Sequence, residues 1–327
     1  MAKIIIGIHG LGNKPEADLL KKWWLDSIKE GLNTSGLIYE HIPFELVYWA
    51  DILHPQPESL HVKDHEDPLY ISEPYTPSQP MGDDKPEPEN LSARIFKYIE
   101  EQLDKIFLRD DMTLNFNNVT DRIIHNYFRD LEVYYSNQSI DQHNPEIPAR
   151  VAIRKRLLDI LKKHTTDEIL LLCHSMGSII AYDVLINHPD ECNINTFVTI
   201  GSPLGIPIII SRIFKEQQSL RVPVNIKKNW YNLSDPEDLV AMDHTLEDDF
   251  PVNQNNIKIQ DMLVYNDYRI NNKKNPHKVY GYLRTPEMTK IITEFLKVER
   301  TGFMKYYHNV LEKVLNLWEK TIPGRKS

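Results

Sequence analysis

The chain is best understood from residues 173–177, Cys173-His174-Ser175-Met176-Gly177. An apolar run, residues 169–172, precedes this pentapeptide, and the helix-like run 178–186 follows it. The order strand, tight turn, helix would hold the serine side chain out of a strained bend and point the first helical N–H groups at whatever the serine attacks. The pattern therefore predicts a nucleophile elbow, although a serine between small residues can also simply cap a helix.

The elbow depends on small residues two positions before and two positions after the serine, because strand and helix approach closely there. These positions hold Cys173 and Gly177. Cysteine replaces the usual glycine, and it is small enough to make the motif a variant of the elbow.

A second motif lies near the N-terminus, where an apolar run predicts a buried strand over residues 3–8 that leads into His9-Gly10-Leu11-Gly12. Such a turn can present a backbone N–H above the sheet. Together with the N–H of Met176, it would bind the oxyanion formed when Ser175 attacks a carbonyl. The alternative is an ordinary glycine turn in which the histidine is merely packed.

A carboxylate is expected in the acidic turn that follows the strand-like stretch near residues 225–233. A carboxylate at the end of a later strand can orient a catalytic histidine and stabilise its imidazolium. Asp238, which precedes an apolar pair, is the favoured candidate. Asp235, which precedes Pro236, better suits a residue that braces the turn, and it stays in reserve.

The histidine is expected after the last strand, residues 257–265, and His277 lies there, ahead of a helical stretch. Ser175, Asp238 and His277 then follow one another in the chain order that the elbow requires. His244 also lies downstream of the serine, but it follows Asp238 so closely that both would compete for one loop.

With these motifs the chain resembles the α/β-hydrolase family, and within it the lipase-like and esterase-like members. The resemblance covers residues 1–50 and 148–300 approximately, and it includes residues 199–204 as a strand end that lines the pocket. It implies that Ser175 is the nucleophile, His277 the general base and then acid, and Asp238 the orienting acid. It also implies that the backbone N–H groups of Leu11 and Met176 form the oxyanion hole.

The predicted fold class is α/β, with the α/β-hydrolase architecture of a mostly parallel sheet flanked by helices and a large inserted helical cap or lid. Strands are expected near residues 3–8, 42–49, 168–173, 195–201, 225–233 and 257–265. Helices are expected near residues 15–31, 147–164, 176–188 and 285–298.

Two stretches, residues 1–50 and 148–327, are predicted to form the hydrolase core, and residues 51–147 an insertion of about a hundred residues. The first part of this insertion, residues 54–90, is rich in proline and acid and predicts an extended, irregular segment. Apolar residues recur at helical spacing in residues 91–135, which predicts amphipathic helices. These helices could cap the pocket, extend the core or form a dimer contact.

Composition narrows the possible partners. The chain carries 38 basic and 47 acidic residues, a net charge of -9, which argues against nucleic acid or an anionic membrane surface as the main partner. No apolar run is long enough for a transmembrane segment. The expected partner is therefore a small-molecule or lipid-like ester substrate, and a homo-oligomer is possible.

Two cysteines, Cys173 and Cys192, do not suggest a disulfide framework, and no secretory signal is evident, so a cytoplasmic location is expected. No cofactor is expected. His61 and His65 lie four residues apart in an acidic segment, and on a helix they would share one face and could bind a metal ion together with the acidic residues. The surrounding prolines make a helix improbable there, so no metal is expected either.

The leading hypothesis is a serine hydrolase that cleaves carboxylic esters through an acyl-enzyme on Ser175. An acyltransferase or a thioesterase would use the same triad and differ only in acceptor or leaving group. A non-catalytic binding protein on the same scaffold is the alternative from another class.

Overall fold

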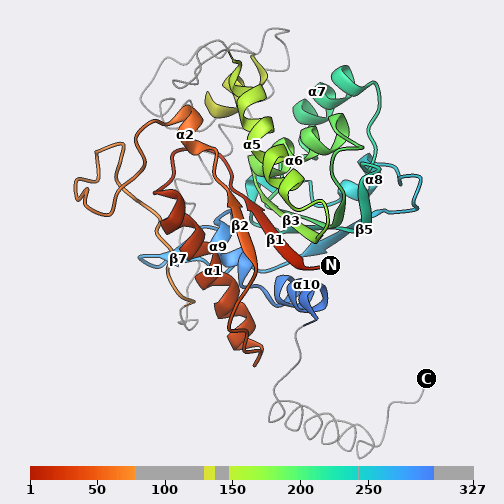
Figure 1. Ribbon diagram of the computed structural model, residues 1–327. Helices are drawn as coiled ribbons and strands as arrows, with labels where there is room; N and C mark the ends of the chain where they lie inside the picture. The colour runs from red at the N-terminus through yellow and green to blue at the C-terminus, as the bar shows by residue number, and fades with distance from the viewer. Residues whose placement is uncertain (79–128, 137–146, 242, 298–327) are drawn as a thin grey trace, which may run out of the picture.

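A six-stranded parallel sheet forms the centre of the part of the chain that this computed structural model describes, residues 1–78, 129–136, 147–241 and 243–297 (Figure 1). In spatial order the strands are β2 (Phe44–Val47), β1 (Lys3–Ile8), β3 (Glu168–His174), β4 (Ile194–Ile200), β5 (Ile226–Ser234) and β6 (Ile259–Leu263). Every neighbouring pair is parallel, so all six strands end at the same edge of the sheet.

Helices cover both faces of this sheet (Figure 1). One face carries α5 (Ala149–Lys163), α6 (Met176–Asn187) and α7 (Pro207–Gln217), and the other carries α1 (Ala17–Thr34), α9 (Val279–Leu283) and α10 (Pro286–Leu296).

The apolar runs of the central strands pack against the helices on both faces of the sheet, because successive side chains of a strand point to opposite faces. Ile6 and Leu171 pack into the cluster with α5, α6 and α7, whereas Ile5 and Leu172 pack into the cluster with α1, α9 and α10. Strands that are buried on both faces read as continuous apolar runs, and this is the pattern from which they were predicted. The predicted parallel sheet flanked by helices is confirmed.

Several expected element ends are wrong by a few residues. The strand expected over residues 42–49 is only Phe44–Val47, because Pro43 has no N–H to give and the short helix α2 (Ala50–Leu53) begins directly afterwards. The last strand, expected over residues 257–265, pairs with β5 only over Ile259–Leu263.

Some elements were not predicted. The helix α7 begins with a run of β-branched isoleucines, which does not favour a helix, and α9 is a single turn with a glycine inside it. The other short elements are the 3-10 helix η1 (Leu239–Ala241), α8 (Leu246–Asp249) and the hairpin β7 (Arg269–Ile270) and β8 (Lys273–Lys274).

The proline-rich part of the predicted insertion is irregular over its described residues, 54–78. Isolated bridges join Glu58 to Pro15 and Ser59 to Tyr70, and the hydroxyl of Tyr268 donates to the carbonyl of Pro74. Residues 129–135 are helical, whereas the remainder of the predicted amphipathic helices, residues 91–128, lies outside the described residues. The division into core and cap stays a prediction.

Candidate active site

Ser175 occupies the bend between β3 and α6, with φ of 53° and ψ of -129°. Positive φ is rare for a residue with a side chain, and it is a strain that folded proteins often keep at functional sites. The backbone of the bend lies against β1: a Cβ on Gly177 would lie 2.6 Å from the carbonyl oxygen of Ile8, and a Cβ on Gly10 would lie 2.7 Å from the Cβ of Ser175. Glycine is therefore required at both positions.

Cys173 takes the other small position of the elbow. It lies on β3, paired with Ile8 and Thr199, and its side chain is fully buried in the cluster that contains α6. Burial raises the pKa of its thiol well above the ordinary value, so the group stays protonated and acts as a small apolar residue.

Ser175, His277 and Asp238 come together at the edge where the strands end. The distance from Nε2 of His277 to Oγ of Ser175 is 3.1 Å, and Nδ1 of His277 lies 3.0 and 2.9 Å from the two carboxylate oxygens of Asp238. Because an ionised carboxylate only accepts hydrogen bonds, the ring proton belongs on Nδ1. The Nε2 atom is then left to accept the serine proton.

Asp238 is held in place by two further donors. The hydroxyl of Tyr282 donates to Oδ2 at 2.6 Å, and the backbone N–H of Val240 donates to Oδ1 at 3.0 Å. Burial, reinforced by the carboxylate, raises the pKa of Tyr282 well above its ordinary value, so this hydroxyl remains a donor. Asp238 is only 1% exposed.

Asp235 has a different set of partners. Its carboxylate accepts from the N–H of Asn266 at 2.6 Å and from the N–H of Glu237 at 2.8 Å, and Lys274 lies 3.5 Å away. Its own N–H donates to the Tyr282 hydroxyl at 2.9 Å. The residue thus braces the ends of β5 and β6, and it does not contact His277.

The end of β4 lies behind the histidine and the acid. Gly201 has φ of 54°, and a Cβ there would lie 2.8 Å from Oδ2 of Asp238 and 3.1 Å from Nδ1 of His277. The glycine permits their close approach. Residues 199–204, expected to line the pocket, are not among the residues that line the cavity beside Ser175, and Gly201 instead lies against the acid and the histidine.

His174 was not singled out from the sequence. Its ring lies 4.8 Å from that of His277, and its Nε2 lies 2.8 Å from the carbonyl oxygen of His277, so the imidazole supports the loop that carries His277. Burial holds the pKa of His174 well below its ordinary value, and the ring is neutral. Its position next to the elbow serine was the only local signal.

The His9-Gly10-Leu11-Gly12 turn lies beside the elbow. Nε2 of His9 accepts from the N–H of Trp49 at 3.0 Å, so its Nδ1 carries the proton and donates to the carbonyl of Gly10 at 2.9 Å. Burial keeps the pKa of His9 well below its ordinary value. Met176 is the first residue of α6, and the N–H groups of the first helical turn have no acceptor within the helix, so its N–H is available to a ligand.

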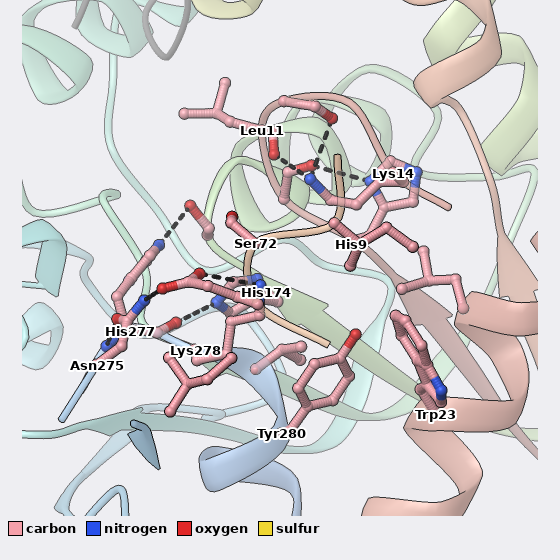
Figure 2. Close-up of a pocket in the computed structure, with 18 of the residues that line it drawn as sticks. His9, Leu11, Lys14, Trp23, Ser72, His174, Asn275, His277, Lys278 and Tyr280 are labelled. Atoms are coloured by element: carbon pink, nitrogen blue, oxygen red, sulfur yellow. Dashed lines mark hydrogen bonds and ion pairs between the residues drawn. The ribbon is translucent and has the colours of Figure 1, made fainter. Parts of the chain in front are cut away.

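A cavity of about 520 Å³ opens onto Ser175 and His277 (Figure 2). Its volume is in the range of pockets that hold small molecules. One group of lining residues is apolar: Leu20, Trp23, Trp24, Ile71, Val279 and Tyr280. Another group is charged: Lys14, Glu58, Glu73, Glu237, Lys273, Lys274 and Lys278.

Other candidates from the sequence lie apart from this cavity. His244, His61 and His65 are not among its lining residues. In the described ranges, no three histidine, cysteine, aspartate or glutamate side chains are arranged to hold a metal ion. Of the helices in those ranges, none has both the length and the apolar character required to cross a bilayer.

The parallel sheet, the serine bend and the acid and histidine on later loops define an α/β-hydrolase type of protein. The family model described as PGAP1-like alpha/beta domain matches residues 113–299, more than half of the 327 residues, and the chain belongs to this family. The family is part of the α/β-hydrolase superfamily, so the predicted resemblance is confirmed at that level. Neither the curated proteins nor the solved structures contain a significant match.

Proposed function

We propose that the protein is a serine hydrolase that cleaves carboxylic esters through an acyl-enzyme. Membership of a hydrolase superfamily supports the general type of enzyme. The observation that carries the proposal is the hydrogen-bonded series Ser175, His277 and Asp238, in which each distance is between 2.9 and 3.1 Å. Such a series gives a serine hydroxyl an adjacent base and gives that base a fixed tautomer.

In the proposed reaction, Oγ of Ser175 attacks the ester carbonyl carbon while its proton passes to Nε2 of His277. The N–H groups of Leu11 and Met176 stabilise the negative charge on the former carbonyl oxygen. The intermediate collapses, the C–O bond to the alcohol breaks, and His277 returns the proton to the leaving oxygen. Water, deprotonated by the same Nε2, then releases the acid and restores the serine.

The apolar group of lining residues supports an ester with a hydrophobic portion. Trp23 and Tyr280, whose rings are 6.0 Å apart and nearly perpendicular, lie on the apolar wall in Figure 2. Burial of a hydrocarbon group against such side chains contributes roughly 25 cal/mol per Å² of apolar area. We therefore propose a lipid-like or other apolar acyl or alcohol group beside the nucleophile.

The insertion supplies part of the cavity wall. Glu58, Ile71, Ser72 and Glu73 all line the cavity and come from the predicted insertion, residues 51–147. Their position supports the proposal that this region caps the site. The two free thiols, Cys173 and Cys192, are buried and unpaired, which suits the proposed cytoplasmic location.

Labelling with a fluorophosphonate, followed by peptide mass mapping, tests the nucleophile. A single adduct on Ser175, absent from Ser175→Ala and present in the control Ser72→Ala, is expected. Ser72 is a matched control because it lines the same cavity and is hydrogen-bonded to no histidine in the described structure. An adduct elsewhere, or none in the native protein, would contradict the assignment.

A panel of p-nitrophenyl esters of increasing chain length tests the substrate. Turnover that rises with chain length and disappears in Ser175→Ala supports ester hydrolysis with an apolar pocket. Parallel assays with thioesters and with added alcohol acceptors separate it from the thioesterase and acyltransferase alternatives. A folded wild type without any turnover and without a Ser175 adduct would favour the non-catalytic binding protein.

A further inference from the structure

The turn that carries the proposed oxyanion donor is intrinsically flexible. Leu11 lies between Gly10 and Gly12, and Gly12 has φ of 82°. Glycine loses more conformational freedom on folding than other residues, so the local sequence does not fix the direction of the Leu11 N–H. An oxyanion hole is effective only when its donors are oriented before the charge develops. Contacts from outside the turn must therefore supply this order.

Lys14, two residues after the turn, holds it from one side. Its ammonium donates to three successive carbonyl oxygens: those of Leu11, of Gly12 at 3.0 Å and of Asn13 at 3.1 Å. Figure 2 shows Lys14 beside Leu11, and both residues line the cavity. Burial among these groups lowers the pKa of Lys14 to about 8, so the ammonium form predominates at neutral pH.

Asp130 holds the same turn from the other side. Its carboxylate accepts from the N–H of Gly12 at 2.7 Å and lies 3.0 Å from Nε2 of His54, and the residue is only 2% exposed. In a trans peptide unit the carbonyl and the N–H point in opposite directions. The peptide unit between Leu11 and Gly12 is thus hydrogen-bonded on both sides: its carbonyl accepts from Lys14, and its N–H donates to Asp130.

The preceding unit is fixed as well, because its carbonyl, that of Gly10, accepts from His9. The Leu11 N–H belongs to this unit and points away from His9. With the next unit gripped by Lys14 and Asp130, neither backbone torsion of Leu11 can change without breaking a hydrogen bond.

We propose that Lys14 and Asp130 are positioning residues that preset the Leu11 N–H for the oxyanion. This inference rests on the proposed function. Asp130 lies in the helical segment 129–135, within the region predicted as an insertion, and Tyr134 of the same segment donates to the buried Asp183 of α6 at 2.7 Å. On this proposal the predicted insertion contributes to the catalytic apparatus itself.

The test uses the full chain with Asp130→Ala, Asp130→Asn and Lys14→Met. Asp183→Ala is the control for Asp130, because it removes a buried carboxylate that holds the same segment without touching the turn. Lys3→Met is the control for Lys14, because Lys3 also donates to a main-chain carbonyl, that of Phe295, and stands at the opposite end of β1. Each variant is checked for cooperative unfolding.

Two kinetic readouts separate positioning from a purely structural role. Asp130→Ala and Lys14→Met should lower kcat about 10- to 100-fold with KM within about threefold, since a misplaced catalytic group can reduce the rate about 100-fold. The inhibition constant of a trifluoromethyl ketone, whose adduct with Ser175 carries an oxyanion, should rise by the same factor as kcat/KM falls. Asp130→Asn should lose less, because its amide oxygen still accepts from Gly12.

A kcat within threefold of the wild type in both Asp130→Ala and Lys14→Met would overturn the inference, as would an equal loss in Asp183→Ala. If Asp130→Ala does not fold, Lys14→Met decides by the same criteria. A wild type that neither hydrolyses esters nor reacts at Ser175 would overturn the proposed function together with this inference. If the wild type hydrolyses esters and Asp130→Ala and Lys14→Met do so equally well, the inference alone is overturned.

Discussion

Replacement of Asp238 by asparagine is the sharpest test of the triad, because the surroundings of the carboxylate restrict how the amide can sit. The N–H of Val240 needs an acceptor at the position of Oδ1. The amide nitrogen is then placed at the position of Oδ2, 2.9 Å from Nδ1 of His277. The amide oxygen at the Oδ1 position lies 3.0 Å from Nδ1 and can still accept its proton, but the amide nitrogen deprives the Tyr282 hydroxyl of its acceptor at 2.6 Å and competes for Nδ1. An amide N–H that donates to Nδ1 moves the ring proton to Nε2. That tautomer cannot take the proton of Ser175.

The reverse orientation of the amide restores the correct tautomer but leaves the buried N–H of Val240 facing an NH₂ group. An unpaired buried donor costs about 1 to 3 kcal/mol. In either orientation the charge that stabilises the imidazolium is also lost. We therefore expect kcat of Asp238→Asn to fall about 10³- to 10⁴-fold, equivalent to about 4 to 5.5 kcal/mol, with little change in KM.

Asp235→Asn is the matched comparison, because Asp235 is equally buried and shares Tyr282 with Asp238, yet its carboxylate contacts main-chain N–H groups of Asn266 and Glu237. It should lose about 1 to 3 kcal/mol of stability and keep kcat within about threefold. Ester hydrolysis and denaturant unfolding of both variants make the measurement. A larger loss of kcat in Asp235→Asn, or a loss below tenfold in Asp238→Asn, would refute the reasoning.

Three further predictions concern Tyr282, Gly177 and His174. Tyr282→Phe removes the 2.6 Å donor to Asp238 and should lower kcat roughly tenfold, as measured by ester hydrolysis, because a less firmly held acid orients His277 less well; unchanged kcat would argue against it. Gly177→Ala places a Cβ 2.6 Å from a main-chain oxygen of β1 and should lower the unfolding midpoint by several degrees, and an unchanged midpoint would show that the elbow can widen. Burial holds the pKa of His174 well below 6.5 in the folded protein. Below pH 6.5 the unfolded chain therefore binds a proton that the native ring does not, and the free energy of unfolding falls by about 1.4 kcal/mol per pH unit as the pH decreases. Above pH 6.5 the contribution of the neutral ring to stability is complete. Denaturant unfolding of wild type and His174→Gln between pH 7.5 and 5 should show a shallower slope for the variant, and equal slopes would contradict the buried neutral ring.

The sequence predicted most of the architecture, because the features that define it are local. A continuous apolar run such as residues 169–172 can be read without any partner, since burial on both faces requires it. The serine between small residues and the order of Ser175, Asp238 and His277 are likewise properties of the chain alone. The choice between Asp238 and Asp235 was harder, because both are acidic residues of one turn and differ only in which neighbours the fold brings to them.

Periodicity and chain order can be read along the chain without any knowledge of its partners in space. They were enough to predict parallel strands alternating with helices, and a serine bend, a glycine turn, an acid and a histidine in hydrolase order. The side chains that hold the site in place became visible only in the folded chain. Asp130 reaches Gly12 across 118 residues, and the His174 ring supports the carbonyl of His277 across 103. Such pairs cannot be recognised from the sequence around either residue. They arise because helices and loops pack around one edge of the sheet, and only that packing brings the distant residues within hydrogen-bond distance.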